Sequence, residues 1–247
     1  ASAGLSWHYC AMTNPHGETR RRAYLDALGI DVWRLRGAES AATGHESVAD
    51  ALPDNGPDTA ELDWAALRER VAACTRCELH KSRTQTVFGV GNEGADWLII
   101  GEAPGSEEDR RGEPFVGRAG KLLDEMLRAV NLGRDGVYIA NILKCRPPGN
   151  RDPSADEAAS CRAYLDRQIA LIRPKLILAV GRIAAQQLLE TDAPLGRLRG
   201  KPHRLERHDL PVVVTYHPAY LLRTPLQKRK AWADLCLARD LIAGSSQ

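Results

Sequence analysis

The sequence predicts an α/β protein, a three-layer α/β/α domain built on a central, mostly parallel sheet of four strands. Two observations support this fold class. Four segments of strand length are almost continuously apolar, as strands are when a parallel sheet is covered on both faces. Segments with helical periodicity alternate with them, which is typical of repeated strand-helix-strand units. All of these apolar segments are far shorter than the roughly 20 residues that a membrane helix needs, so no membrane span is expected.

The expected elements follow the apolar pattern along the chain. A helix over 62–73 leads to the first two cysteines. Ser154 and Glu157 form a capping box, and Pro153 before them helps to set the start of the longest helix. The strands are expected at 97–100, 137–143, 176–180 and 212–215, and the helices that follow them at 119–130, 154–172, 182–190 and 226–242.

Two segments precede the main domain, which we place at residues 64–247. Residues 1–37 contain a tail and a short helical element, whose apolar pattern predicts a helix that stops near Gly29. An isolated helix of this length is unstable in water, so it either docks on its own domain or binds a partner protein. Residues 38–63 hold seven acidic residues, no Lys or Arg, and Pro53 and Pro57, which predicts a disordered acidic linker.

The net charge of +2 does not by itself indicate a nucleic-acid partner, but the charge is unevenly placed. Residues 196–230 hold nine Lys and Arg residues and only two acidic residues. Such a segment is either an ordinary solvated surface or a face that binds phosphates. Arg199 and Lys201 are the candidate DNA-binding residues of its first half.

Four cysteines form the most informative pattern in the chain. Cys74 and Cys77 form a C-x2-C pair, and fifteen residues separate Cys145 from Cys161. Four thiolates from distant segments suit either an iron–sulfur cluster or a zinc ion. Two further cysteines lie outside the pattern and are expected to be free thiols, which fits a reducing cytoplasm; they are Cys10 and Cys236.

Polar residues gather where the predicted strands end, which is where α/β sheets bind ligands. The first strand runs into Gly101-Glu102-Ala103-Pro104-Gly105, which matches neither a phosphate-binding nor a dinucleotide-binding pattern. Asn141 lies inside an apolar strand, where a buried amide needs partners. His217 follows the last strand, and Phe115 lies near glycines; each is either a core residue or a ligand contact.

Three stretches together resemble the family 4 uracil-DNA glycosylases of bacterial type, the iron–sulfur-containing branch of that superfamily. The first joins residues 101–105 through Glu108 and Asp109 to Pro114-Phe115-Val116-Gly117-Arg118-Ala119-Gly120. The second is Asn141-Ile142-Leu143-Lys144-Cys145-Arg146-Pro147-Pro148, and the third is His217-Pro218-Ala219-Tyr220-Leu221-Leu222-Arg223. With the cysteine spacing, the resemblance covers roughly residues 67–241 and leaves out the N-terminal element and the linker.

The resemblance implies a [4Fe–4S] cluster with a structural task, and zinc is the second choice for the same site. The cluster would be held by Cys74, Cys77, Cys145 and Cys161. It also implies a monomeric enzyme of the bacterial cytoplasm, associated with the nucleoid.

The partner that the resemblance implies is uracil-containing DNA, single- or double-stranded. Uracil would be flipped out of the DNA into a pocket that includes Gly101 and Ala103. Phe115 would stack on the base and Asn141 would read its Watson–Crick edge. His217 would donate a hydrogen bond to uracil O2 as the N-glycosidic bond breaks, and water would complete an abasic site.

The acid that positions this water is left open by the sequence. The best-known uracil glycosylases have an Asp at the position of Ala103, so the remaining candidates are Glu102, Glu108 and Asp109. Glu102 has a second interpretation, as a residue that excludes thymine.

The last motif resembles a loop that wedges into the minor groove, with Leu221 and Leu222 as the apolar plug and Arg223 as the phosphate contact. Its alternative interpretation is the start of a helix whose leucines belong to the core. Two other functions were weighed. A metal-stabilised DNA-binding or polymerase-associated module without glycosylase activity would need neither Asn141 nor His217. A relative that traps DNA covalently would need a basic insertion after Asn141, which residues 144–161 lack.

Overall fold

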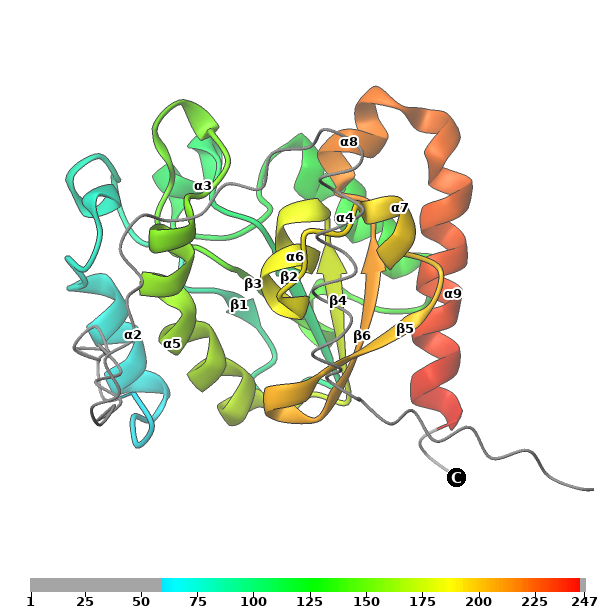
Figure 1. Ribbon diagram of the computed structural model, residues 1–247, viewed down its shortest axis with the longest axis horizontal. Coiled ribbons are helices and arrows are strands. Elements are labelled where there is room, and N and C mark those ends of the chain that lie inside the picture. The colour runs from blue at the N-terminus through cyan, green and yellow to red at the C-terminus, as the bar shows by residue number, and fades with distance from the viewer. Residues whose placement is uncertain (1–58, 245–247) are drawn as a thin grey trace, which may run out of the picture. The chain divides into compact units, whose positions relative to one another are not determined.

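The computed structural model describes residues 59–244, so the predicted N-terminal element and most of the predicted linker lie outside the described residues. The described part is a sheet covered by helices on both faces (Figure 1). The strand order is β1-β3-β2-β4-β6-β5. The strands are β1 Val90–Gly91, β2 Trp97–Gly101, β3 Tyr138–Asn141, β4 Leu176–Val180, β5 Pro202–Leu205 and β6 Leu210–Thr215.

The four predicted strands are confirmed as the parallel centre of this sheet, β3-β2-β4-β6. The structure adds two antiparallel edge strands, β1 beside β3 and β5 beside β6, which the sequence analysis missed. β1 has only two residues, and β5 begins with Pro202 and is partly exposed. Short strands and prolines are typical of sheet edges, and neither gives the continuous apolar signal of a central strand.

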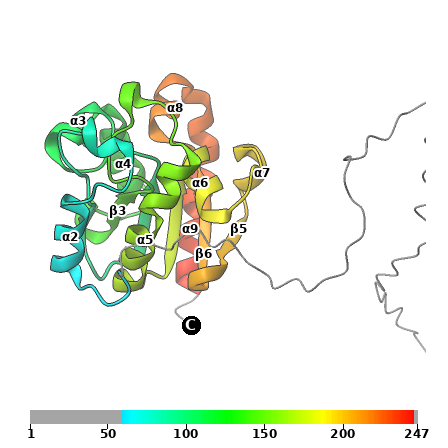
Figure 2. The same cartoon turned by 60° about the vertical axis from the view of Figure 1, so that its left-hand side comes forward.

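Alternate residues of each central strand point to opposite faces of the sheet. On one face, Leu98, Ile100 and Ala140 pack against α5 (Ala155–Ile172) and α6 (Arg182–Leu189). On the other face, Trp97, Ile99 and their neighbours pack against α4 (Arg118–Arg128), α8 (Pro218–Arg223) and α9 (Lys228–Gly244). Figures 1 and 2 show these helices on the two sides of the sheet. This arrangement confirms the predicted three-layer α/β/α architecture.

The long helices lie within a few residues of their predicted positions. They are α2 Trp64–Ala72, α4 Arg118–Arg128, α5 Ala155–Ile172, α6 Arg182–Leu189 and α9 Lys228–Gly244. Two short helices were not expected, α3 Ser106–Arg111 and α7 Leu195–Leu198. A third, α8 Pro218–Arg223, is the helix that the sequence offered as the alternative to a wedge loop. The short 3-10 turns are η1 Glu78–Lys81, η2 Arg134–Gly136, η3 Pro148–Asn150, η4 Glu206–His208 and η5 Pro225–Gln227.

The capping box of α5 is confirmed. Glu157 N donates to Ser154 Oγ at 3.2 Å, and Ser154 N donates to the Glu157 carboxylate at 2.9 Å. Arg151 also binds this carboxylate, at 2.6 and 2.9 Å. These hydrogen bonds lower the pKa of Glu157 to about 2. The start of α5 is therefore fixed where the sequence predicts it.

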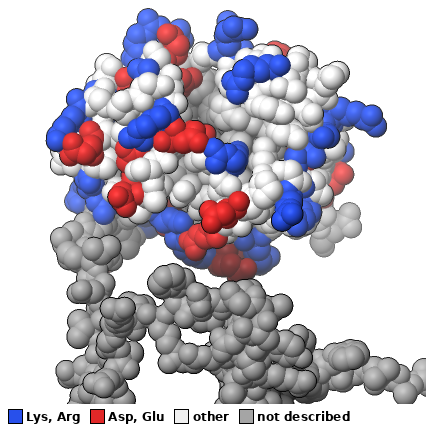
Figure 3. Space-filling model, turned by 45° about the horizontal axis from the view of Figure 1, so that its top comes forward, with Lys and Arg blue, Asp and Glu red and all other residues white. Residues whose placement is uncertain are grey.

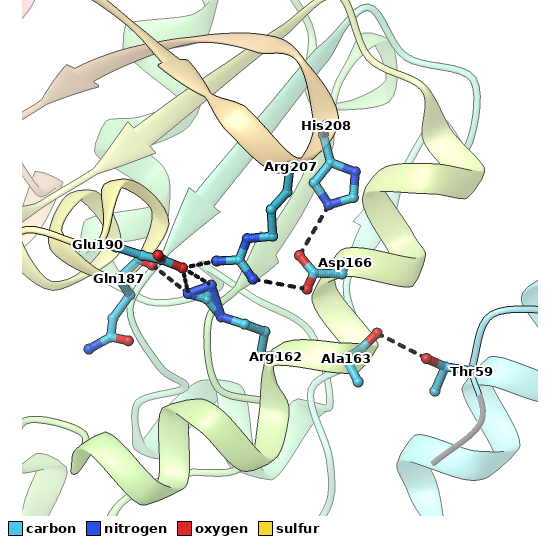
Figure 4. Close-up of polar contacts among 8 residues, drawn as sticks. All are labelled: Thr59, Arg162, Ala163, Asp166, Gln187, Glu190, Arg207 and His208. Carbon is cyan, nitrogen blue, oxygen red and sulfur yellow. Dashed lines mark hydrogen bonds and ion pairs between the residues drawn. The ribbon is translucent and has the colours of Figure 1, made fainter. Parts of the chain in front are cut away.

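α5 also holds the first described residues of the chain. Thr59 Oγ1 donates to the carbonyl of Ala163 at 3.3 Å, and Leu62 packs beside α2 and Tyr164. These contacts lie inside the predicted linker, so its last residues are part of the main domain. On the same helix Asp166 contacts Arg207 and His208 of η4, which ties the β5–β6 hairpin to α5 (Figure 4). No helix of the described part is long and apolar enough to cross a membrane.

Candidate active site

A cavity of about 500 Å³ opens at the carboxyl ends of β2 and β3, beside the start of α8. Figure 3 shows a recessed area at this edge of the molecule, with both basic and acidic side chains around it. The cavity is lined by Glu102, Ala103, Gly105, Glu108, Phe115, Ala119, Asn141, Asn150, His217, Ala219, Tyr220 and Arg223. The structure thus brings together most of the residues that the sequence proposed for a base pocket.

Gly101 keeps the floor of this cavity open. It ends β2 and pairs with Asn141 at the end of β3. A Cβ at this position would lie 2.5 Å from Asn141 Oδ1 and 2.6 Å from Phe115 Cζ. Such distances are far inside van der Waals contact, so glycine is required for these two side chains to meet here.

Asn141 presents an unused acceptor to the cavity. Its side chain is buried, and within the described residues its Oδ1 has no hydrogen-bond partner. A buried acceptor without a partner is destabilising by about 1–3 kcal/mol. The atom is therefore available to a ligand that brings an N–H group.

Phe115 closes the cavity with a strained backbone. Its φ is 55°, in the left-handed region that few residues other than glycine adopt. The loop is held by Glu108, whose Oε1 accepts hydrogen bonds from the backbone of Val116 and Gly117 at 3.0 and 3.2 Å. On its other side, Gly120 admits the Phe115 carbonyl, since a Cβ there would lie 1.7 Å from that oxygen. Strain kept in this way is common at ligand-binding positions.

His217 is the N-cap of α8, and its hydrogen bond sets its tautomer. Nδ1 accepts from Ala219 N at 3.2 Å, so the proton of a neutral ring lies on Nε2. Burial, and then the charge of Arg223, lower the pKa of His217 to about 4. The imidazole is neutral at physiological pH and offers one N–H donor.

The three candidate acids lie in different surroundings. Glu102 lines the cavity, and burial followed by the nearby Asp152 raises its pKa. Glu108 also lines it, but one of its oxygens holds the Phe115 loop. Asp109 is not among the lining residues, because its buried carboxylate accepts from Thr84 N at 2.9 and 3.1 Å. The geometry therefore favours Glu102 over Asp109.

Two residues that were expected to contact DNA make their contacts within the protein instead. Leu221 is 1% exposed and packs in the core beneath α8, so it cannot act as a plug. Arg199 binds the buried carboxylate of Asp234 at 2.8 and 3.1 Å and lies over the ring of Tyr216. The burial of Leu221 agrees with the alternative interpretation of the motif, a helix with core leucines. The basic run around Arg199 does not reveal that this side chain meets a buried carboxylate.

Other residues of the same surface remain accessible. Leu222 is 37% exposed, and Arg223 and Lys201 are exposed as predicted. Leu226 in η5 is 91% exposed, more than any other large apolar side chain in residues 59–244, and the sequence did not indicate it. Its only signal was an isolated leucine between Pro225 and a basic run.

The four cysteines of the predicted metal site line one small cavity. They come from the turn after α2, the segment after β3 and the second turn of α5. Arg83 donates to Cys145 Sγ at 3.1 Å, and Lys144 also lines the cavity. Within residues 59–244, no three His, Cys, Asp or Glu side chains converge closely enough to hold a metal ion. The donor set is nonetheless all thiol with cations beside it, which fits a thiolate-bound cluster.

Comparison with known proteins finds relatives of one kind. Residues 88–236 match the family described as the uracil DNA glycosylase superfamily. The chain is 46% identical to the type-4 uracil-DNA glycosylase of Archaeoglobus fulgidus over 170 residues, 66% of this chain and 85% of that protein. It is 45% identical to the type-4 enzyme of Thermotoga maritima over 156 residues, 63% of this chain and 81% of that protein. It is 41% identical to that of Sulfurisphaera tokodaii over 182 residues, 71% and 83% of the two chains.

Proposed function

The chain belongs to the uracil-DNA glycosylase superfamily and to its type-4 branch, and from that premise we propose how its own residues perform the reaction. It is a uracil-DNA glycosylase, a hydrolase that removes uracil from DNA and initiates repair. Uracil in a duplex is inaccessible, so the nucleotide is flipped out of the stack into the cavity beside Asn141. Unstacking the nucleotide requires a few kcal/mol, and this free energy is smallest in single strands and at mismatches.

The unpaired Oδ1 of Asn141 is the observation that carries this proposal. It accepts from uracil N3–H, while the side-chain amide donates to O4. Cytosine lacks the N3–H and carries an amino group in place of O4, so both groups of Asn141 would lose their partners. A site built around such hydrogen bonds rejects the wrong base strongly.

Phe115 and His217 act on the same base. The ring of Phe115 stacks on uracil, which contributes on the order of 1–3 kcal/mol. Bond cleavage develops negative charge on uracil O2, and the Nε2–H of His217 donates to this oxygen. Because the neutral ring is already oriented by Ala219, little reorganisation is needed as the charge appears.

We assign the water-positioning carboxylate to Glu102. It lines the cavity, and within the described residues no hydrogen bond holds its side chain. Glu102→Gln keeps the shape and removes the charge, and we expect it to lower the single-turnover rate while uracil affinity changes little. If Glu102 instead excludes thymine, the variant will keep its uracil rate and gain thymine release.

We assign the DNA-binding contacts to the accessible residues beside the cavity. Leu222 and Leu226 enter the space that the flipped base leaves, and Arg223 and Lys201 contact phosphates. This assignment keeps the predicted wedge but moves it away from Leu221.

We assign a [4Fe–4S] cluster to the four thiols, in preference to one zinc ion. The four thiols line one cavity together with Arg83 and Lys144, and four cysteine thiolates are the usual ligand set of a [4Fe–4S] cluster. The cluster would supply structural cross-linking between the segment after α2, the end of β3 and α5. Its ligands would be Cys74, Cys77, Cys145 and Cys161.

A uracil-release assay on single-stranded, G·U and A·U substrates tests the function directly. We expect release from all three, fastest without a pairing partner, and none from cytosine. Asn141→Ala should retain DNA binding and lose release, while Asn92→Ala, outside the cavity, should match wild type. A wild-type protein that binds DNA but releases no uracil would support the DNA-binding module instead.

A further inference from the structure

Lys144 is a buried lysine that lies between the thiol cavity and the base cavity. Its Nζ donates to the backbone carbonyl of Asn141 at 3.0 Å and to Gln168 Oε1 at 2.6 Å. Gln168 is itself buried, and its Nε2 donates to the carbonyl of Phe88 at 2.9 Å. The ammonium group is therefore held at a fixed point under the end of β3.

The charge of this ammonium has no carboxylate partner. Both of its acceptors are neutral, and within residues 59–244 no Asp or Glu forms an ion pair with Lys144. A buried cation is strongly destabilising unless an anion lies beside it. Lys144 lines the same small cavity as the thiols of Cys145 and Cys161. Thiolates are the form of cysteine that binds metals, so a loaded site brings negative charge next to the ammonium.

We propose that Lys144 is a positioning residue that couples the thiol-bound cluster to Asn141. The cluster's negative charge keeps the ammonium in place, and the ammonium holds the Asn141 backbone so that its side chain faces uracil. Lys144 does not line the base cavity, so it acts only through its neighbours. The proposal rests on the function proposed above and deepens it, because it links the cluster to base reading by charge as well as by chain connectivity.

Position in the sheet supports this route. Ile142 N donates to the Gly101 carbonyl at 3.0 Å, which fixes the β3 end on one side. Lys144 fixes the Asn141 carbonyl on the other side. The backbone around Asn141 is therefore held both by a hydrogen bond to β2 and by the ammonium group of Lys144.

The first experiment measures the cluster and needs no activity. In the purified holoenzyme, Lys144→Met removes the charge and keeps the length, and Gln168→Glu leaves Lys144 but adds an opposing charge beside it. Both should lower the midpoint potential in protein-film voltammetry. The reduced cluster carries more negative charge, so losing or offsetting the nearby positive charge destabilises it. Lys144→Met should also speed iron release to a chelator by roughly 10- to 100-fold, as outer-shell changes do. The exposed Lys121→Met is the matched control.

An unchanged potential in both variants would overturn the charge coupling, since a purely structural role has no reason to shift it. Should Lys144→Met fail to fold by circular dichroism, Gln168→Glu alone decides the question.

The second experiment asks whether Lys144 works through Asn141. Single-turnover uracil release is measured for Lys144→Met, Asn141→Ala and the double variant. We expect Lys144→Met to slow release roughly 10- to 100-fold in the wild-type background and to add little in the Asn141→Ala background. The same cycle with His217→Ala should be additive. Additive effects of Lys144→Met and Asn141→Ala would overturn this inference and leave the proposed function intact. If the wild-type protein released no uracil, the proposed function would be wrong. The potential measurement would still test the role of Lys144 in that case.

Discussion

The rings of Phe115 and His217 face each other with centroids 5.6 Å apart and planes inclined by 30°. One ring comes from the loop between α3 and α4, and the other from the turn between β6 and α8. Phe115, which we assign to stacking on uracil, and His217, which we assign to donating to uracil O2, therefore form one continuous wall of the cavity. Their contact makes the stacking surface and the hydrogen-bond donor parts of a single preorganised unit.

The aromatic face of Phe115 should contribute to uracil binding. Phe115→Leu keeps apolar bulk but removes the stacking surface, so we expect affinity for uracil-containing single strands to fall roughly tenfold to a hundredfold. Fluorescence anisotropy with a non-cleavable substrate measures it. Phe88→Leu, in a core group away from the cavity, should lower the melting temperature without changing affinity. Equal effects of both variants on affinity would contradict the stacking role.

The low pKa of His217 predicts a characteristic pH profile. The ring stays neutral down to a pH near 4, so its NMR chemical shifts should be flat from pH 8 to about 5 and titrate with a midpoint near 4. In the unfolded chain the ring protonates near its usual pKa of about 6.5. The unfolded state therefore binds the extra proton between these values, and this contribution to stability, complete above pH 6.5, is lost as the pH falls towards 4.

His217→Asn should remove that slope from the unfolding free energy measured with urea, and lower the rate about 100- to 1,000-fold, as loss of an oxyanion donor does. His208→Ala, which alters a histidine outside the cavity, serves as the control. A ring whose NMR shifts titrate near pH 6.5 in wild type would show that it is not held neutral.

Adding one carbon at Gly101 should close the base pocket. The new Cβ of Gly101→Ala would meet Asn141 Oδ1 and Phe115, so we expect about 1–3 kcal/mol of destabilisation and loss of uracil release. Gly136→Ala is the matched control, because no atom lies within 4 Å of a Cβ there. Urea unfolding and the release assay give the two readouts. Normal uracil release by Gly101→Ala would place the base elsewhere.

Leu226 should matter for paired DNA only. Because the side chain is almost fully exposed, Leu226→Ala should leave stability within about 0.5 kcal/mol of wild type. We expect slower excision from G·U and A·U duplexes and unchanged excision from single strands, where no gap must be filled. Leu226→Met, which keeps the apolar bulk, should restore duplex activity. An equal loss on both kinds of substrate would argue against a wedge.

Metal analysis should find about four irons per chain after anaerobic purification. Cys74→Ser should reduce the iron content and the melting temperature, since the thiols join three segments of the fold. Cys236→Ser, outside the thiol cavity, should change neither. A colourless protein with one zinc ion would contradict the cluster assignment.

The sequence predicts the central sheet well because buried parallel strands such as Leu176–Val180 are continuously apolar. It predicts the residues that meet in the cavity because strand ends converge in this topology. It does not reveal the direction of single side chains on short elements. Leu221 and Leu222 are adjacent in one short helix, yet one is buried and the other exposed.

The sequence also does not show which side chains form ion pairs or hydrogen bonds when they lie far apart in the chain. Arg199 and Asp234 lie on different elements, and only the packing of α9 against the sheet brings them together. The role of Lys144 was missed for the same reason, since its partner Gln168 lies on the next helix.

The capping box of α5 determines the direction in which the fourth thiol points. Cys161 lies on the helix that Ser154 and Glu157 start, so the direction of its sulfur is counted from that cap. Each residue of an α-helix turns the chain by about 100°. One residue inserted or deleted between Ser154 and Cys161 would swing the sulfur around the helix and away from the other three. The number of residues in this stretch is therefore fixed more strictly than their identity, and homologous chains that keep the four thiols should vary here by substitution and not by length.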